Sequence, residues 1–189
     1  MRVVIDLSEN DLDHFRDAMR RAKEAAHSLT PDDITAAARQ LLEDSKDKEL
    51  PDFVAQRLIK LDTMINMATD QSWGISDDER KEILSALTYF ADPNDAIPDD
   101  IPVLGFLDDA IMIELVVEEL KHELDAYEDF RAFRNQAAEE SGVEFAGELN
   151  RQDWLDQRQR ELLDRMRSRR GRDRGGYGGS RGYSLFSAR

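Results

Sequence analysis

The sequence predicts an all-α protein, and three features of the chain support this fold class. Apolar residues recur at spacings of three and four along most of the chain, which is the period of a helix with one buried face. Residues that cap helix N-termini precede several of these stretches, and only five prolines interrupt 189 residues. With 40% hydrophobic and 35% charged residues, the composition is typical of a charge-rich helical protein with a sizeable core.

The first two predicted helices begin at residues suited to helix N-termini. Ser8 is a good N-cap, with acidic residues in the turn that follows it. Thr30 precedes Pro31, so that a capping residue is followed by the proline favoured at the first helical position. The apolar faces of the two helices are Leu12, Phe15, Met19, Ala22 and Ala26, and then Ile34, Ala37, Ala38, Leu41 and Leu42.

Two more helices are predicted before residue 92. Pro51 opens the third, and Ser76 with Glu79 forms a capping box at the start of the fourth. The fourth helix is expected to end near Asp92, because the following proline disfavours helical geometry. Their apolar faces are Val54, Leu58, Leu61, Ile65 and Ala68, and then Ile83, Leu84, Leu87 and Ala91.

Residues 92–109 form a segment rich in proline and aspartate, DPNDAIPDDIPVLGFLDD. Pro98 and Pro102 restrict the backbone, whereas Gly105 permits conformations that other residues resist. This order of residues resembles the central motif of the YkvA-like family, bacterial helical domains built around a PxDxIPDxIPxxGxxDD pattern. The resemblance covers roughly residues 84–119. It implies a helical domain of unknown function with no established activity.

The remaining chain divides by composition. A long helix is predicted from Leu107 to about Glu140, with an apolar face that includes Ile113, Val116, Val117, Leu120, Leu124 and Tyr127. The expected organisation is a single acidic helical bundle at 1–140, a charged helix within 141–168, and a disordered tail rich in Arg, Gly and Tyr at 169–189. The last helix is expected from Gln152 to about Arg167. Only residues 2–6 are strand-like, and a lone strand has no ladder partner.

Charge is distributed unevenly along the chain. The net formal charge is −15, but eight arginines and one aspartate give the last 25 residues +7, which leaves −22 on residues 1–164. Such a body repels nucleic acid at long range, whereas the tail attracts it.

The aspartate-rich segment is a candidate site for a divalent cation. Asp95, Asp99, Asp108 and Asp109 supply the oxygen ligands that Mg²⁺ or Ca²⁺ prefers, although no EF-hand spacing is present. The alternative is structural, because aspartates also cap helices and bond to loop amides, and we favour it. We therefore predict no required cofactor, with Mg²⁺ or Ca²⁺ as the alternative.

Other chemistry is weakly supported. Glu24 with His27, and Glu119 with His122, have the Glu-x-x-His spacing of di-iron bundles, but Glu24 and His122 face away from the apolar stripes of their helices. The chain has no cysteine, nucleophile elbow, P-loop or dinucleotide fingerprint, so we predict no catalytic residues and favour a non-enzyme.

The C-terminal segment is the candidate partner-binding element. Arginines interleaved with glycine and tyrosine suit contact with single-stranded RNA. The segment could instead solubilise the protein, bind anionic lipid, or pair with the acidic body or a neighbouring copy. The proposed contact residues are Arg167, Arg169, Arg170, Arg172, Arg174, Tyr177 and Tyr183, with Leu185 and Phe186 as apolar anchors.

The leading functional hypothesis is a non-enzymatic interaction or adaptor protein with an acidic body and a basic tethering tail. The alternatives are an RNA- or ribosome-associated protein and a metal-dependent enzyme that uses the aspartate-rich segment. We expect a cytoplasmic location without a transmembrane span, because five acidic residues interrupt the most apolar stretch and the start is unlike a signal peptide. An unidentified protein partner, RNA and self-association are the expected interactions.

Overall fold

The computed structural model describes residues 8–25, 29–91, 106–139 and 148–175. Within these ranges the regular structure consists of seven α-helices and two short 3₁₀-helices, which confirms the predicted all-α class. The chain divides into two compact units. Unit 1 comprises Met1–Thr69 and Ser76–Glu119, and unit 2 comprises Asp70–Ile75 and Leu120–Arg189. Among the described residues, no helix is both long and apolar enough to cross a membrane.

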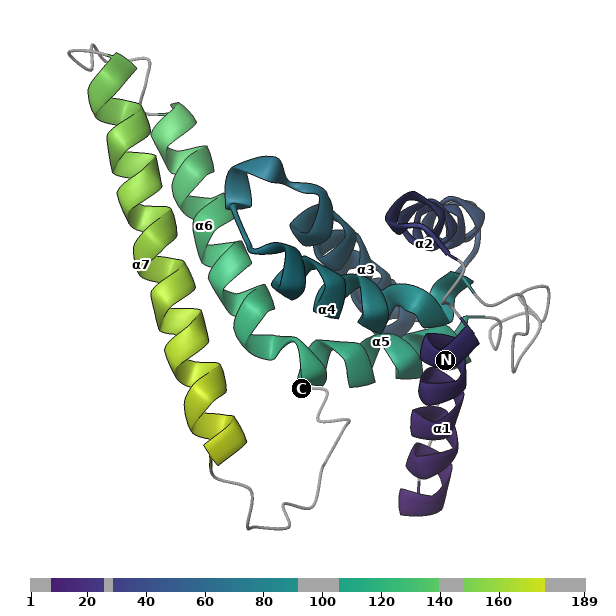
Figure 1. Cartoon of the computed structure of the whole chain (residues 1–189). Coiled ribbons are helices and arrows are strands. Elements are labelled where there is room, and N and C mark those ends of the chain that lie inside the picture. The colour runs from purple at the N-terminus through teal and green to yellow at the C-terminus, as the bar shows by residue number, and fades with distance from the viewer. Residues whose placement is uncertain (1–7, 26–28, 92–105, 140–147, 176–189) are drawn as a thin grey trace. The chain divides into compact units, whose positions relative to one another are not determined.

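Unit 1 holds the N-terminal helices and the helix that follows the proline–aspartate segment. Its elements are α1 (Glu9–Ala25), α2 (Pro31–Ser45), α3 (Asp52–Thr69), α4 (Asp77–Leu87), the 3₁₀-helix η3 (Thr88–Ala91) and α5 (Leu107–Glu119) (Figure 1).

The caps predicted for α2 and α4 are confirmed. Thr30 Oγ1 accepts a hydrogen bond from the Asp33 amide at 3.2 Å, and the Asp33 carboxylate accepts one from the Thr30 amide at 2.9 Å. Ser76 and Glu79 repeat the arrangement at 3.3 and 2.9 Å. Each box satisfies two amides that the first helical turn leaves without carbonyl partners, so both helix starts are fixed by local sequence.

The core of unit 1 lies where α5 packs against α3. Leu61, Met64 and Ile65 of α3 and Met112 and Ile113 of α5 are fully buried. The sequence placed the helices flanking the proline–aspartate segment at the centre, but α3 rather than α4 packs most extensively against α5. Two ion pairs also link helices to α5: Arg57 of α3 pairs with Glu114 at 2.9 Å, and Lys23 of α1 pairs with Glu119 at 3.1 Å.

Unit 2 consists of a short turn and two long helices. The 3₁₀-helix η2 (Gln71–Trp73) lies in the turn, and α6 (Lys121–Glu139) and α7 (Glu148–Gly175) run antiparallel, side by side (Figure 1). Leu124, Tyr127 and Phe130 of α6 and Leu162 and Met166 of α7 are buried. A helix hairpin is therefore the main element of this unit.

The single helix predicted from Leu107 to about Glu140 is wrong. The chain forms two helices that are interrupted at Leu120, whose carbonyl accepts the first hydrogen bond of α6 from Leu124. No glycine or proline marks this point. The break separates residues that pack in unit 1 from residues that pack in unit 2, so tertiary packing rather than local sequence places it.

The expected start of the tail at residue 169 is also corrected. Helix α7 continues to Gly175 and begins at Glu148, four residues before the predicted start at Gln152. Arg170 and Asp173 pair with residues of α6, and these contacts favour the helix despite the low propensity of Gly171. Residues 176–189, the rest of the predicted tail, lie outside the described residues.

Ser76→Ala is expected to destabilise the protein by about 0.5–2 kcal/mol, because it removes the side chain that caps α4. Chemical denaturation monitored by circular dichroism measures the change. Ser168→Ala, an exposed position inside α7, is the control and should alter stability by less than about 0.5 kcal/mol. Equal stability of Ser76→Ala and the parent protein would show that the capping box does not hold this helix.

Candidate interaction surface

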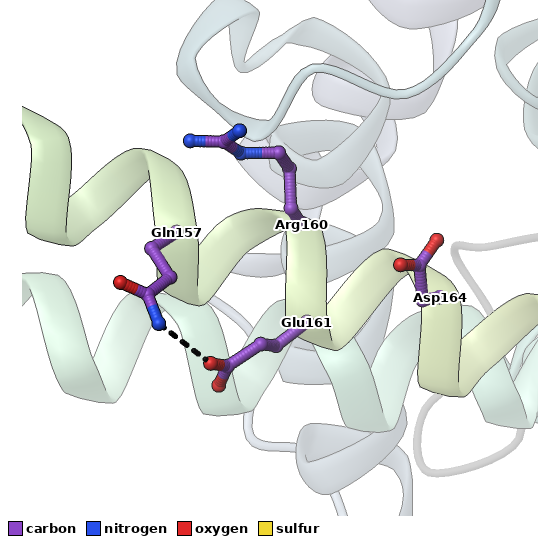
Figure 2. A pocket seen from close by; sticks show the side chains of 4 residues that line it. All are labelled: Gln157, Arg160, Glu161 and Asp164. Carbon is purple, nitrogen blue, oxygen red and sulfur yellow. Dashed lines mark hydrogen bonds between the residues drawn. The ribbon is translucent and has the colours of Figure 1, made fainter.

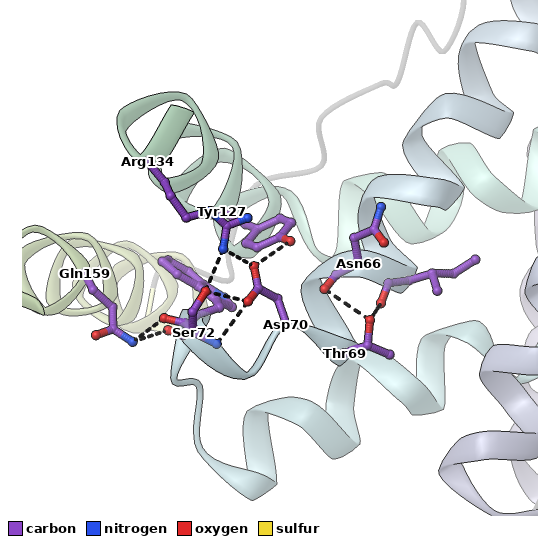
Figure 3. Close-up of polar contacts among 9 residues, drawn as sticks. Asn66, Thr69, Asp70, Ser72, Tyr127, Arg134 and Gln159 are labelled. Carbon is purple, nitrogen blue, oxygen red and sulfur yellow. Dashed lines mark hydrogen bonds and ion pairs between the residues drawn. The ribbon is translucent and has the colours of Figure 1, made fainter. Parts of the chain in front are cut away.

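The turn at Asp70–Ile75 is fastened to the helix hairpin by the carboxylate of Asp70. This carboxylate accepts hydrogen bonds from the Ser72 amide at 2.9 Å and the Ser72 hydroxyl at 2.6 Å. Its second oxygen accepts from Tyr127 Oη at 3.1 Å and from Arg134 Nη1 at 2.8 Å (Figure 3). Asp70 thus caps η2 and binds two residues of α6 at once.

Trp73 is the apolar residue of the 3₁₀-helix η2, and it lies in the core of unit 2. Its side chain is fully buried, and its ring lies 5.6 Å from that of Tyr127 and 5.1 Å from that of Phe130. Gln159 of α7 donates to the carbonyls of Ser72 and Trp73 at 3.0 and 2.7 Å. Both helices of the hairpin therefore hold the turn.

The Asp70 network shifts two pKa values in opposite directions. Burial disfavours the ionised carboxylate of Asp70, but hydrogen bonds from Ser72 and Arg134 outweigh burial and lower its pKa. Burial, followed by the neighbouring charge of Asp70, raises the pKa of Tyr127 to about 12. The pair is thus held as a carboxylate and a neutral phenol.

An exposed row of ion pairs runs along one edge of the hairpin. Arg169 lies 3.9 Å from Asp125, and Arg165 lies 4.0 Å from Asp129. From the first pair to the second, the partner on α6 lies four residues later and the partner on α7 lies four residues earlier. This is the spacing expected of two antiparallel helices packed side by side. The four side chains are 44–66% exposed, so each pair contributes at most about 1 kcal/mol.

The end of α7 is held more firmly, by contacts that we call the clasp. Arg170 Nε lies 2.9 Å from a Glu123 carboxylate that is only 4% exposed. Asp173 lies 2.7 Å from His122 Nε2 and 3.5 Å from Lys121 Nζ. The hydrogen bond with His122 is the main effect that lowers the pKa of Asp173. The clasp joins the last turns of α7 to the first turn of α6.

Four exposed arginines at this end of α7 form the candidate interaction surface, which we call the α7 arginine surface. They are Arg165, Arg167, Arg169 and Arg172. At the helical period, Arg165, Arg169 and Arg172 share one edge of α7, and Arg167 projects from another side.

The structure separates the predicted partner-binding residues into groups. Arg167, Arg169 and Arg172 are exposed on α7, whereas Arg170 belongs to the clasp. Arg174 lies in the last turn of α7. Tyr177, Tyr183, Leu185 and Phe186 lie outside the described residues.

A shallow depression lies on α7 before these arginines. Gln157, Arg160, Glu161 and Asp164, all from this one helix, line it, and Gln157 donates to Glu161 at 3.2 Å (Figure 2). Its lining residues are polar or charged, and a single helix supplies all of them. It therefore lacks the enclosing apolar walls of a small-molecule site.

Only two of the four predicted cation ligands fall among the described residues. Asp108 and Asp109 lie in the first turn of α5 and are 1% and 4% exposed, whereas Asp95 and Asp99 fall outside the described ranges. Within those ranges, no group of three or more His, Cys, Asp or Glu residues could hold a metal ion. Phe106 precedes the aspartates with a left-handed φ of 65° and a buried ring.

The two residues of the second Glu-x-x-His motif make different contacts. Glu119 pairs with Lys23 at the end of α5, and His122 pairs with Asp173 in the clasp. His27 lies outside the described residues. These pairings give Glu119 and His122 structural roles in the two units.

Comparison with known proteins adds one partial match. A family model described as a protein of unknown function (DUF1232) matches residues 80–115. This stretch runs from the first turn of α4 into α5 and contains the whole proline–aspartate segment, residues 92–109. The match supports a domain of unknown function in this part of the chain. Neither the curated proteins nor the solved structures yield a match.

Gly74→Ala is expected to destabilise the protein by about 1–3 kcal/mol. Gly74 has a φ of 64°, and an added Cβ would overlap Gln159 Nε2, which holds two carbonyls of the turn. Gly171→Ala is a matched control, because a Cβ meets nothing within 4 Å there and alanine favours the helix. The midpoint of chemical denaturation should fall for Gly74→Ala and rise for Gly171→Ala. Shifts in the same direction would contradict the role of Gly74.

Asp70→Asn is expected to move the pKa of Tyr127 from about 12 toward 10, because it removes the negative charge and the carboxylate acceptor. A raised pKa means that the neutral phenol stabilises the fold below pH 10 and that this contribution is lost as pH rises toward 12. Ultraviolet difference titration measures the pKa of Tyr127, and the Tyr127→Phe variant identifies which part of the signal belongs to this residue. An unchanged titration in Asp70→Asn would refute the coupling.

Proposed function

We propose that this protein is a non-enzymatic, cytoplasmic interaction protein that binds its partner through the α7 arginine surface and the residues that follow it. The observation that carries the proposal is that the arginines at the end of α7 fall into two groups, one held in an ion pair of the clasp and one exposed. Arg170 is committed to the clasp at 2.9 Å from Glu123, whereas Arg165, Arg167, Arg169 and Arg172 remain exposed. The clasp fixes the helix that presents them.

The proposal also includes a YkvA-like domain around residues 84–119. Its support is the family match at 80–115 together with the Pro, Gly and Asp spacing of the motif. Helix α5, which follows the motif, supplies much of the core of unit 1. We therefore assign the domain a scaffolding role and place partner binding in unit 2.

The other two functions receive less support. A metal-dependent enzyme would need Asp108 and Asp109 to meet further ligands, and these two carboxylates are buried at the start of α5. The RNA-associated function uses the same arginines as the leading proposal. It differs only in the class of partner.

Affinity purification of the tagged full chain from its native host tests the proposal. Replacing Arg165, Arg167, Arg169 and Arg172 by Gln should reduce captured partners to the level of the untagged control, because it removes the exposed guanidinium groups. Replacing Arg16, Arg20, Arg21 and Arg39 of α1 and α2 by Gln makes the same change in charge and should leave capture intact. Quantitative mass spectrometry and RNA staining measure both.

A chain that ends at Gly175 separates α7 from the residues beyond it, and it keeps the clasp residues Arg170 and Asp173. Loss of partners in this chain alone would assign binding to residues 176–189. Full capture by both the quadruple α7 variant and the shortened chain would move the function to the acidic unit 1. That result would overturn the proposal.

A further inference from the structure

We infer that the partner of the α7 arginine surface is single-stranded RNA, whose phosphates bind the row formed by Arg165, Arg169 and Arg172. This inference rests on the proposed function, because it names the partner of the same surface. The three residues are spaced by four and three positions on one helix edge, which places them about 6 and 4.5 Å apart along the axis. Such a row can follow a strand of phosphates.

The choice of basic residue favours phosphate and base recognition. After Lys121 the chain contains thirteen arginines and no lysine. Lysine would solubilise the chain equally well, but only a guanidinium group binds phosphate bidentately and stacks on bases.

The existing ion pairs of this row are readily exchanged. Arg165 and Arg169 lie 4.0 and 3.9 Å from their carboxylates, longer than the 2.9 Å between Arg170 and Glu123. Because the row is exposed, whereas Arg170 is half-buried against the buried Glu123, phosphates can displace Asp129 and Asp125 while the clasp remains. RNA binding should therefore use Arg165, Arg169 and Arg172 but not Arg170.

The same carboxylates argue against an acidic peptide as the partner. Asp125 and Asp129 already offer the row two carboxylates within the same molecule, so a separate peptide gains little by replacing them. An RNA strand carries condensed counterions, and their release on binding adds a driving force. Neither α6 nor a short acidic peptide provides this driving force. Competition with α6 thus selects for a polymer of high charge density.

Fluorescence anisotropy of the full chain with a labelled oligouridylate of about 20 nucleotides tests the inference, at salt concentrations from about 50 to 200 mM. The variant with Gln at 165, 169 and 172 should bind more weakly. Its slope of log K against log salt should fall in magnitude by about two, since each phosphate contact to a single strand contributes about 0.7. The control with Gln at 16, 21 and 39 should keep the parent slope.

Removing the competing carboxylates should act in the opposite direction. Asp125→Asn with Asp129→Asn should tighten binding by about two- to fivefold, because the arginines lose their internal partners. The same change at Asp77 and Asp78, which are at least 90% exposed on α4, is the matched control and should have a smaller effect.

Three results would overturn the inference: no binding of the parent protein at the lowest salt, an unchanged slope in the triple variant, or equal displacement of the oligonucleotide by polyglutamate of matched charge. None of them decides the proposed function. Capture of a nuclease-resistant protein partner that depends on the α7 arginine surface would uphold that function while RNA binding fails. Circular dichroism of each variant confirms that the helices remain folded.

Discussion

The carboxylate of Asp70 holds unit 2 together at the point where its three segments meet. It joins the 3₁₀-helix η2 to α6 through Tyr127 and Arg134, and η2 in turn carries the carbonyls that Gln159 of α7 binds. Trp73 can be fully buried only if the short turn beside it keeps this shape. Burial of Trp73 and Ile75 docks the six-residue turn, but burial has no direction, so these hydrogen bonds set the orientation of the turn.

The hairpin uses charge in two physically different ways. In the Arg170–Glu123 pair, at 2.9 Å, the carboxylate is buried and the guanidinium half-buried, so removing Arg170 would leave the Glu123 charge in a poorly solvated place. The Arg165–Asp129 and Arg169–Asp125 pairs are exposed and near 4 Å, where solvent and salt weaken them. Pairs of the first kind fix the end of α7. Pairs of the second kind follow the antiparallel register of the hairpin without fixing it, and they leave their arginines available to a stronger anion.

Local signals in the sequence predicted much of unit 1 and less of unit 2. The boxes at Thr30 and Ser76 act within four residues, so the starts of α2 and α4 could be read directly. The break at Leu120 and the extension of α7 to Gly175 depend on contacts between distant segments, and neither has a residue signal of its own. Asp70 with Ser72 fits the pattern of a local Asx turn, but Tyr127 and Arg134 lie more than fifty residues away.

The candidate site likewise depends on contacts that the local sequence does not signal. Composition was enough to point to the arginines, because charge density needs no structure to be recognised. It could not distinguish Arg170 from Arg169, which are adjacent in sequence but project about 100° apart on the helix. That rotation carries Arg170 to the buried carboxylate of Glu123 and Arg169 to the exposed edge.

The acidic character of the chain gains a physical role from this arrangement. With −22 on residues 1–164, every anion, RNA included, meets repulsion at long range, and at the surface it meets competition from Asp125 and Asp129. Both effects fall with ionic strength, and at physiological salt the repulsion is screened beyond about 8 Å. An anion that reaches the row must then exchange with carboxylates held on the neighbouring helix. Only an anion of high charge density is therefore expected to displace the carboxylates of α6. The clasp holds the end of α7 so that its arginines remain available to such an anion.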